Sequence, residues 1–189
     1  MNNEVDLEAI KSTFFSKGFV VLEPLVNDVD LNIIGEEVEK NLGHLKMGQA
    51  PTFESNDLIL KLSSIQKKIF SPHLLMILKE ILQTDLLEVQ HSKYNSKNES
   101  GGSIVPIHQD FPFFPHTDGR LIAVSFHLDG SSPQNGGMFG YPGIWTKPLP
   151  HEQTEQGFRE IPKKFRLSKP ENFICQPGGI SIHSSFLPH

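Results

Sequence analysis

Three segments in the first half of the chain carry apolar residues at the 3.6-residue spacing of an amphipathic helix. They predict helices over residues 7–16, from Asp28 or Asp30 to about Leu42, and from about Pro72 to Leu82. The apolar positions of the three stripes are Leu7, Ile10, Phe14 and Phe15; Leu31, Ile34, Val38 and Leu42; and Leu75, Leu78, Ile81 and Leu82. We interpret all three stripes as core packing and assign no function to them.

Residues that typically begin or end helices support these boundaries. Gly18 ends the first helix and is followed by Phe19–Leu22, an apolar run that predicts a strand. Ser71 suits the N-cap of the third helix and Pro72 its first position, where proline is favoured. Residues 44–57 have no regular pattern, and we expect them to be irregular.

After residue 84 the pattern changes to short strands. The candidates, separated by Gly, Ser, Asn and Pro clusters, are Leu86–Tyr94, Leu121–Leu128, Met138–Tyr141 and Ile180–His183. Helices first and strands afterwards predict an α+β domain, with the helices packed on one side of a β-sandwich or barrel. The polar segment from Lys147 to Lys169 is too long for a simple turn, and it predicts a lid or insertion at the mouth of the sheet.

Composition narrows the class of protein. The chain has 189 residues, 37% hydrophobic and 21% charged, which fits one ordinary globular domain. Its net charge of −5 and the lack of a Lys/Arg block argue against a nucleic-acid partner. With Cys175 as its single cysteine, we expect a reducing, cytoplasmic environment. No apolar run has the length of a signal peptide core or a membrane span, so we expect neither.

The clearest chemical signal is His108-Gln109-Asp110. In an extended chain residues i and i+2 point to the same face, so His108 and Asp110 can aim at one point. An imidazole and a carboxylate suit iron(II), and a second histidine would complete the facial triad of non-haem iron oxygenases. The motif alone is weak, because a loop histidine hydrogen-bonded to a nearby carboxylate is common.

The order of the surrounding motifs resembles the phytanoyl-CoA dioxygenase family. The resemblance covers nearly the whole chain, from about Leu7 to His189. The matching features are the H-Q-D motif, a following strand that ends in Asp129, Asn135-Gly136, Pro142-Gly143, and the closing segment from Gly178. Together these motifs are fairly specific, although each one alone is not.

This resemblance implies a double-stranded β-helix (jelly roll) with N-terminal helices packed on one sheet. Residues 1–84 would be the helical support and residues 85–189 the jelly-roll core of a single domain. The implied activity is that of an Fe(II)- and 2-oxoglutarate-dependent dioxygenase, which uses dioxygen to hydroxylate a small-molecule substrate. The sequence does not name the substrate.

Two histidines compete for the third ligand position. The family's ligand lies eleven residues beyond Gly178, which favours His189. His183 is the alternative, although it sits inside an alternating strand with Ile180 and Ile182 on the opposite face. His116 and His127 are minor candidates, with roles in a solvated loop or a cavity wall more typical for them. The metal ligands expected are therefore His108, Asp110 and His189. We expect Cys175 to be a buried apolar residue rather than a nucleophile.

The resemblance also suggests co-substrate residues. A strand over residues 87–97 would carry Gln90 and Lys97, which match positions that face the 2-oxo acid. The family's Ser or Thr and Arg, which bind the distal carboxylate of 2-oxoglutarate, would follow His189. We therefore expect a chain truncated at its C-terminus, binding 2-oxoglutarate weakly when made alone. Gly179 stands where the family usually has an acidic residue.

Two other classes remain open from the sequence. A cupin-like metal-binding protein would keep the triad but produce no succinate. An inactive pseudo-enzyme of the same fold would bind no metal.

Overall fold

The computed structural model describes residues 6–42, 52–56, 62, 66–97, 104–114, 116–155 and 158–189. The chain forms two compact units. One consists of Met1–Glu23 with Val105–His189, and the other of Pro24–Ile104. The described residues form helices and antiparallel sheets, as the α+β pattern predicts.

The first unit begins with helix α1 (Leu7–Lys17), followed directly by strand β1 (Phe19–Leu22). Asp6 caps the helix by accepting a hydrogen bond from the amide of Ala9 at 3.0 Å. Gly18 ends it in the left-handed conformation with φ 82°, a backbone that glycine adopts without steric cost. The predicted helix, stop and strand are all confirmed.

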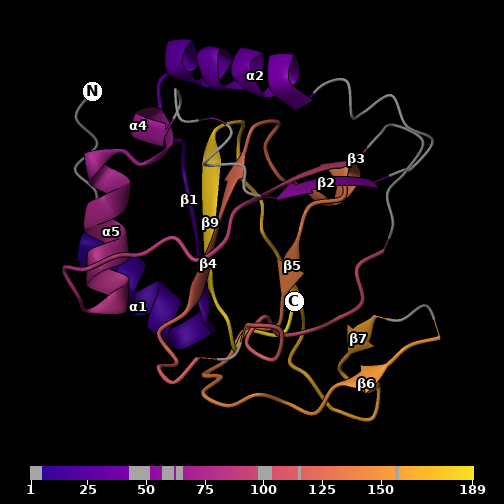
Figure 1. Cartoon of the computed structure of the whole chain (residues 1–189). Helices are drawn as coiled ribbons and strands as arrows, with labels where there is room; N and C mark the ends of the chain where they lie inside the picture. The colour runs from indigo at the N-terminus through magenta and orange to yellow at the C-terminus, as the bar shows by residue number, and fades with distance from the viewer. Residues whose placement is uncertain are drawn as a thin grey trace. The chain divides into compact units, whose positions relative to one another are not determined.

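The main sheet of this unit has three antiparallel strands in the order β1-β9-β4 (Figure 1). Strand β9 (Gly179–Ser184) is central, and strand β4 (Ile122–His127) lies on its other side. The register places His183 of β9 between Phe19 and Ala123. Both predicted strands are confirmed to within two residues at each end.

Alternation divides β9 into two faces. Ile180 and Ile182 are 1% and 0% exposed and point to one face, while Ser181 and His183 are buried on the other. The chain therefore carries one apolar and one polar face through the centre of its main sheet.

Short strand pairs complete the first unit. Strand β5 (Phe139–Gly140) pairs with β8 (Glu171–Asn172), and β6 (Glu152–Gln153) pairs with β7 (Arg159–Glu160). The 3-10 helix η3 (Pro133–Asn135) precedes β5. The segment expected to be a lid thus contains the β6–β7 pair. A small apolar core of Phe19, Phe173 and Leu187 joins β1 to the C-terminal segment.

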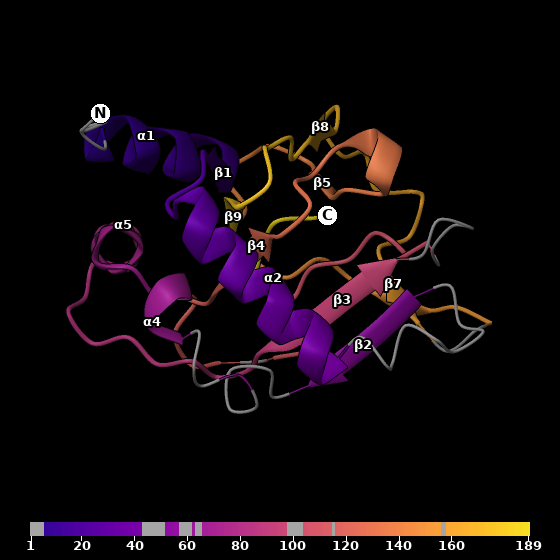
Figure 2. The same cartoon turned by 90° about the horizontal axis from the view of Figure 1, so that it is seen from above.

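The second unit contains α2 (Asp28–Leu42), α4 (Gln66–Ile69) and α5 (Pro72–Leu82), and strand β2 (Thr52–Asn56) pairs with β3 (Lys93–Lys97) (Figure 2). Ser71 caps α5 by accepting a hydrogen bond from the amide of Leu74 at 3.2 Å, as expected. Its buried residues are Leu74, Ile77, Leu78 and Ile81, so the predicted stripe was rotated by one position. Among the described residues, no helix is long and apolar enough to cross a membrane.

Two expectations for the second unit were wrong. Residues 52–56 form strand β2, although their sequence shows no clear alternation. The strand expected over Leu86–Tyr94 begins only at Lys93, and residues 86–92 have no regular structure. In both places the backbone pairing of β2 with β3, and not side-chain pattern, defines the strands.

Candidate metal centre

The H-Q-D segment lies beside the last residues of the chain. His108 and His189 exchange both backbone hydrogen bonds, at 3.0 Å and 2.9 Å, and the amide of Phe111 donates to the carbonyl of Ser185 at 2.9 Å. A residue pair that exchanges both bonds lies directly opposite in an antiparallel ladder, so its side chains share one face. The two imidazoles accordingly lie with ring centroids 4.4 Å apart.

Asp110 brings its carboxylate to the same point. One ligand atom each from His108, Asp110 and His189 lies within 4.8 Å of the others. Oδ1 of Asp110 is 3.7 Å from Nε2 of His108 and 3.9 Å from Nε2 of His189. The structure thus brings together the three residues that the sequence singles out as metal ligands.

Backbone carbonyls fix the tautomers of both histidines. Nδ1 of His108 is 2.9 Å from the carbonyl oxygen of Pro106, and Nδ1 of His189 is 3.0 Å from that of Leu187. A carbonyl oxygen only accepts, so each Nδ1 carries the proton and each Nε2 is left with a lone pair. This is how metal-binding histidines are usually oriented by their outer partners.

The donor set fits a metal ion. Two lone pairs and a carboxylate oxygen face one another, which is unfavourable unless a cation lies between them. At 3.7 Å and 3.9 Å the nitrogen–oxygen separations are too long for hydrogen bonds. They remain within the roughly 4.2 Å that two ligand atoms can span when each is about 2.1 Å from one ion.

The protonation states at the site also suit a metal. Burial would raise the pKa of the Asp110 carboxyl, but the surrounding imidazoles outweigh burial, with His183 donating to Oδ2, and hold this pKa below its ordinary value. Burial, reinforced by His183 and partly opposed by Asp110, lowers the pKa of His189 to about 3. Near neutral pH the site therefore offers an ionised carboxylate and a neutral His189 imidazole.

Gln109 anchors the segment from the opposite side. Its side chain is 0% exposed, its Nε2 donates to the carbonyls of Phe186 and Lys147, and its Oε1 accepts from the amide of Leu149 at 2.6 Å. These bonds tie the H-Q-D segment both to the segment before His189 and to residues 147–149. Gln109 was not among the residues predicted to be functional; its place between two candidate ligands, pointing away from them, was the available signal.

The other histidines have different surroundings. His183 is buried, and its Nε2 lies 3.2 Å from Oδ2 of Asp110. His127 is half-buried, with its Nε2 2.9 Å from the hydroxyl of Ser181, and burial lowers its pKa. His116 is exposed. Burial raises the pKa of the Cys175 thiol, which disfavours a nucleophilic role.

Gln90 and Lys97 both belong to the second unit. Gln90 is exposed and lies in no strand, so the prediction of a strand that includes Gln90 was wrong. Lys97 is the last residue of β3. Their part in co-substrate binding stays a prediction.

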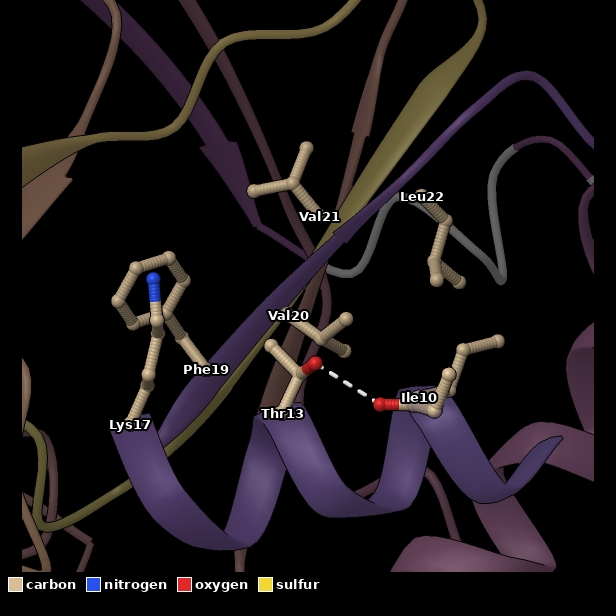
Figure 3. Close-up of a pocket in the computed structure, with 8 residues that line it drawn as sticks. Ile10, Thr13, Lys17, Phe19, Val20, Val21 and Leu22 are labelled. Atoms are coloured by element: carbon tan, nitrogen blue, oxygen red, sulfur yellow. Dashed lines mark hydrogen bonds between the residues drawn. The ribbon is translucent and has the colours of Figure 1, made fainter. Parts of the chain in front are cut away.

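An open groove between α1 and β1 offers less chemistry than the candidate metal centre around Asp110 (Figure 3). Its polar groups are already engaged. The hydroxyl of Thr13 donates to the carbonyl of Ala9 at 2.8 Å, and Nζ of Lys17 pairs with Glu171 at 2.8 Å and lies 6.0 Å from the ring centroid of Phe19. The candidate chemistry of the first unit therefore centres on Asp110.

Two imidazoles and one carboxylate beside an antiparallel sheet are the donor set of a facial-triad metal protein. The chain belongs to the phytanoyl-CoA dioxygenase (PhyH) family, whose model matches residues 14–185.

One curated protein is similar to most of this chain. A probable alpha-ketoglutarate-dependent hypophosphite dioxygenase of Stutzerimonas stutzeri is 26% identical over 160 residues, covering 76% of this chain. The chain spans 56% of the length of that relative.

Solved structures share the fold at low sequence identity. The non-haem alpha-ketoglutarate-dependent carbocyclase SnoK from nogalamycin biosynthesis matches with TM-score 0.79 and 14% identity, covering 98% of this chain and 77% of SnoK. EctD from S. alaskensis with bound Fe matches with TM-score 0.75 and 16% identity, covering 100% of this chain and 72% of EctD.

Proposed function

We propose that this protein is an Fe(II)- and 2-oxoglutarate-dependent dioxygenase that hydroxylates a small-molecule substrate, with iron held by His108, Asp110 and His189. The observation that carries the proposal is the convergence of their ligand atoms within 4.8 Å, in a chain of this family. The named relative is described as alpha-ketoglutarate-dependent, and a solved neighbour contains bound Fe, which supports the same cofactors here.

The donor set favours iron(II) with open coordination positions. Two imidazole nitrogens and one carboxylate oxygen would hold a six-coordinate iron(II) by three positions, and the other three could take a chelating 2-oxo acid and dioxygen. When bound, the iron would supply oxidation of a substrate C–H or P–H bond by dioxygen, coupled to decarboxylation of 2-oxoglutarate to succinate and carbon dioxide. The share of the protein is to orient the ligands, through the Pro106 and Leu187 carbonyls, and to keep Nε2 of both histidines free of protons.

We propose a jelly roll as the specific fold of this α+β protein. The three-stranded antiparallel sheet would be one wall, and the paired segments around His108 and His189 the beginning of the other. The single-domain arrangement, with residues 1–84 supporting a core of residues 85–189, and a cytoplasmic location are kept as predictions of the sequence.

A cationic side chain lies over Phe113, whose ring packs against the candidate ligand His108. The guanidinium of Arg159 is 6.0 Å from the ring centroid of Phe113, and Phe113 meets the ring of His108 edge-on at 5.6 Å. In the described part of the chain Arg159 has no ion-pair partner. This supports a substrate with a negative charge, and hypophosphite, the substrate named for the relative, is the first compound to test.

The test combines metal binding with turnover. Anaerobic calorimetry should show one Fe(II) per chain. A large excess of 2-oxoglutarate, which offsets the weak binding expected of this chain, should then give the charge-transfer absorbance of a chelated 2-oxo acid. Addition of dioxygen to this complex should then convert 2-oxoglutarate to succinate. Asp110→Ala should abolish all three signals. The matched control is Asp118→Ala, which removes an exposed carboxylate that pairs with Arg120.

The outcomes separate the alternative classes. Metal binding without 2-oxoglutarate chelation or succinate, even at that excess of 2-oxoglutarate, would indicate a cupin-like metal protein. Wild-type protein that takes up no Fe(II) would indicate a pseudo-enzyme and overturn the proposal.

A further inference from the structure

His183 is the third imidazole at the candidate metal centre, and it lies on the central strand β9 instead of on a loop. Its backbone is paired on both sides, opposite Phe19 and Ala123. Its ring centroid is 4.4 Å from that of His189 and 6.1 Å from that of Phe173, and the residue is 2% exposed. The position of this ring is therefore fixed by regular structure and packing.

His183 contacts the carboxylate oxygen that the other two histidines do not face. Its Nε2 is 3.2 Å from Oδ2 of Asp110, whereas Nε2 of His108 and His189 both face Oδ1. An ionised carboxylate only accepts, so Nε2 of His183 carries a proton. His183 thus presents a donor to Asp110, while His108 and His189 present lone pairs.

The second ring nitrogen separates His183 from an ordinary core histidine. Nδ1 of His183 is buried and has no hydrogen-bond partner among the described residues. The two candidate ligands, in contrast, each bind a backbone carbonyl through Nδ1. Leaving a buried polar atom unpaired is unfavourable, so a histidine at this position needs a compensating interaction. The hydrogen bond from Nε2 of His183 to Asp110 is that interaction.

We propose that His183 is a positioning residue that holds Asp110 as a one-oxygen metal ligand. This role rests on the proposed metal centre. A carboxylate with both oxygens free can bind a metal through either one or both. Binding through both would fill a fourth position and leave two of six, fewer than a chelating 2-oxo acid and dioxygen require. By engaging Oδ2, His183 directs Oδ1 alone toward the metal and keeps three positions open.

The test uses Co(II) as a spectroscopic probe of the full chain. His183→Gln keeps an N–H donor near the Nε2 position, and His183→Leu removes the donor at similar size. His183→Asn, whose amide is too short to reach Oδ2, replaces the leucine variant if that does not fold. Ile182→Val is the matched control, because Ile182 is the neighbouring buried residue on the opposite face of β9.

We expect His183→Leu or His183→Asn to weaken Co(II) binding about 10- to 100-fold, the usual effect of losing an outer partner of a metal ligand. Their Co(II) visible absorption spectra should also change, because the carboxylate is freed to bind through both oxygens. His183→Gln should bind within about threefold of wild type with an unchanged spectrum, and so should Ile182→Val. A merely structural histidine would leave the spectrum of the bound metal unaltered.

Three results would overturn the inference. Wild-type affinity and spectrum in the leucine or asparagine variant would mean that His183 does not position Asp110. Loss of metal in every His183 variant, with retention in His189→Ala, would make His183 itself the ligand. No Co(II) uptake by the wild type would remove the metal centre altogether. Co(II) binding that depends on His183, in a protein that forms no succinate, would keep this inference and overturn the dioxygenase proposal instead.

Discussion

His151 has the same local geometry as the two candidate ligand histidines, but its environment is different. Its Nδ1 binds the carbonyl of Leu149, two residues earlier, at 2.8 Å, as Nδ1 of His108 and of His189 bind the carbonyl two residues earlier. The Nε2 of His151, however, accepts a hydrogen bond from the backbone amide of Gln109 at 3.1 Å. Its lone pair is satisfied by the protein itself.

The comparison shows what distinguishes a structural histidine from a ligand. All three rings have the same proton position, so the tautomer alone does not identify a ligand. The difference is the group that faces Nε2: a donor for His151, and an acceptor for His108 and His189. Two acceptors facing each other need a cation between them, and this requirement marks the site around Asp110.

The largest expected effect separates the two kinds of histidine directly. His108→Ala and His189→Ala should each weaken Fe(II) or Co(II) binding at least 100-fold, or about 2.7 kcal/mol, because each removes a proposed metal ligand. His151→Ala should bind within about threefold of wild type. Calorimetry on the three variants measures this, and equal losses in all three would end the distinction.

Metal should also stabilise the protein only where the ligands are intact. At a Co(II) concentration about 100 times the dissociation constant, binding adds about 2.7 kcal/mol to the free energy of unfolding. We therefore expect Co(II) to raise the midpoint of thermal unfolding of wild type and His151→Ala but not of His108→Ala. A metal-induced shift in His108→Ala would place the ion elsewhere.

Gln109 connects His151 to the candidate metal centre. Its backbone amide donates to Nε2 of His151, and its side chain hydrogen-bonds the segments that carry the candidate ligands. Gln109→Leu leaves buried backbone groups unpaired and should lower the free energy of unfolding by about 1–3 kcal/mol. We expect metal affinity to fall about tenfold as well, since the ligand segments lose a shared anchor. Gln153→Leu, at an exposed position on β6, is the control. Unchanged stability and affinity would show that Gln109 is dispensable.

The smallest effect is expected at His151 itself. His151→Ala removes the acceptor of the Gln109 amide and should cost about 1 kcal/mol of stability, measured by denaturant unfolding. His151→Gln, which can offer an acceptor oxygen, should recover part of this loss. A large loss of metal binding in either variant would show that His151 belongs to the metal centre.

The local features of this fold were predictable from the sequence. Ser71 and Pro72 define the start of α5, and Gly18 defines the end of α1, because capping and left-handed backbone are decided by neighbouring residues. The i, i+2 spacing of His108 and Asp110 likewise indicates a shared face. Strand β2 and the extent of β3 were not predictable, because their pairing depends on residues about 40 positions apart.

The roles of the C-terminal histidines depended on tertiary structure. The sequence named His183 and His189 as competing ligands, but it could not say which groups would face each ring nitrogen. Those groups come from distant segments: His108 pairs with the backbone of His189, and Asp110 reaches His183 across 73 positions. A histidine acts as ligand, donor or core residue according to the partners of its two nitrogens. The sequence alone therefore determined where the candidate chemistry lies, and the folded chain determined which atom of each histidine meets Asp110.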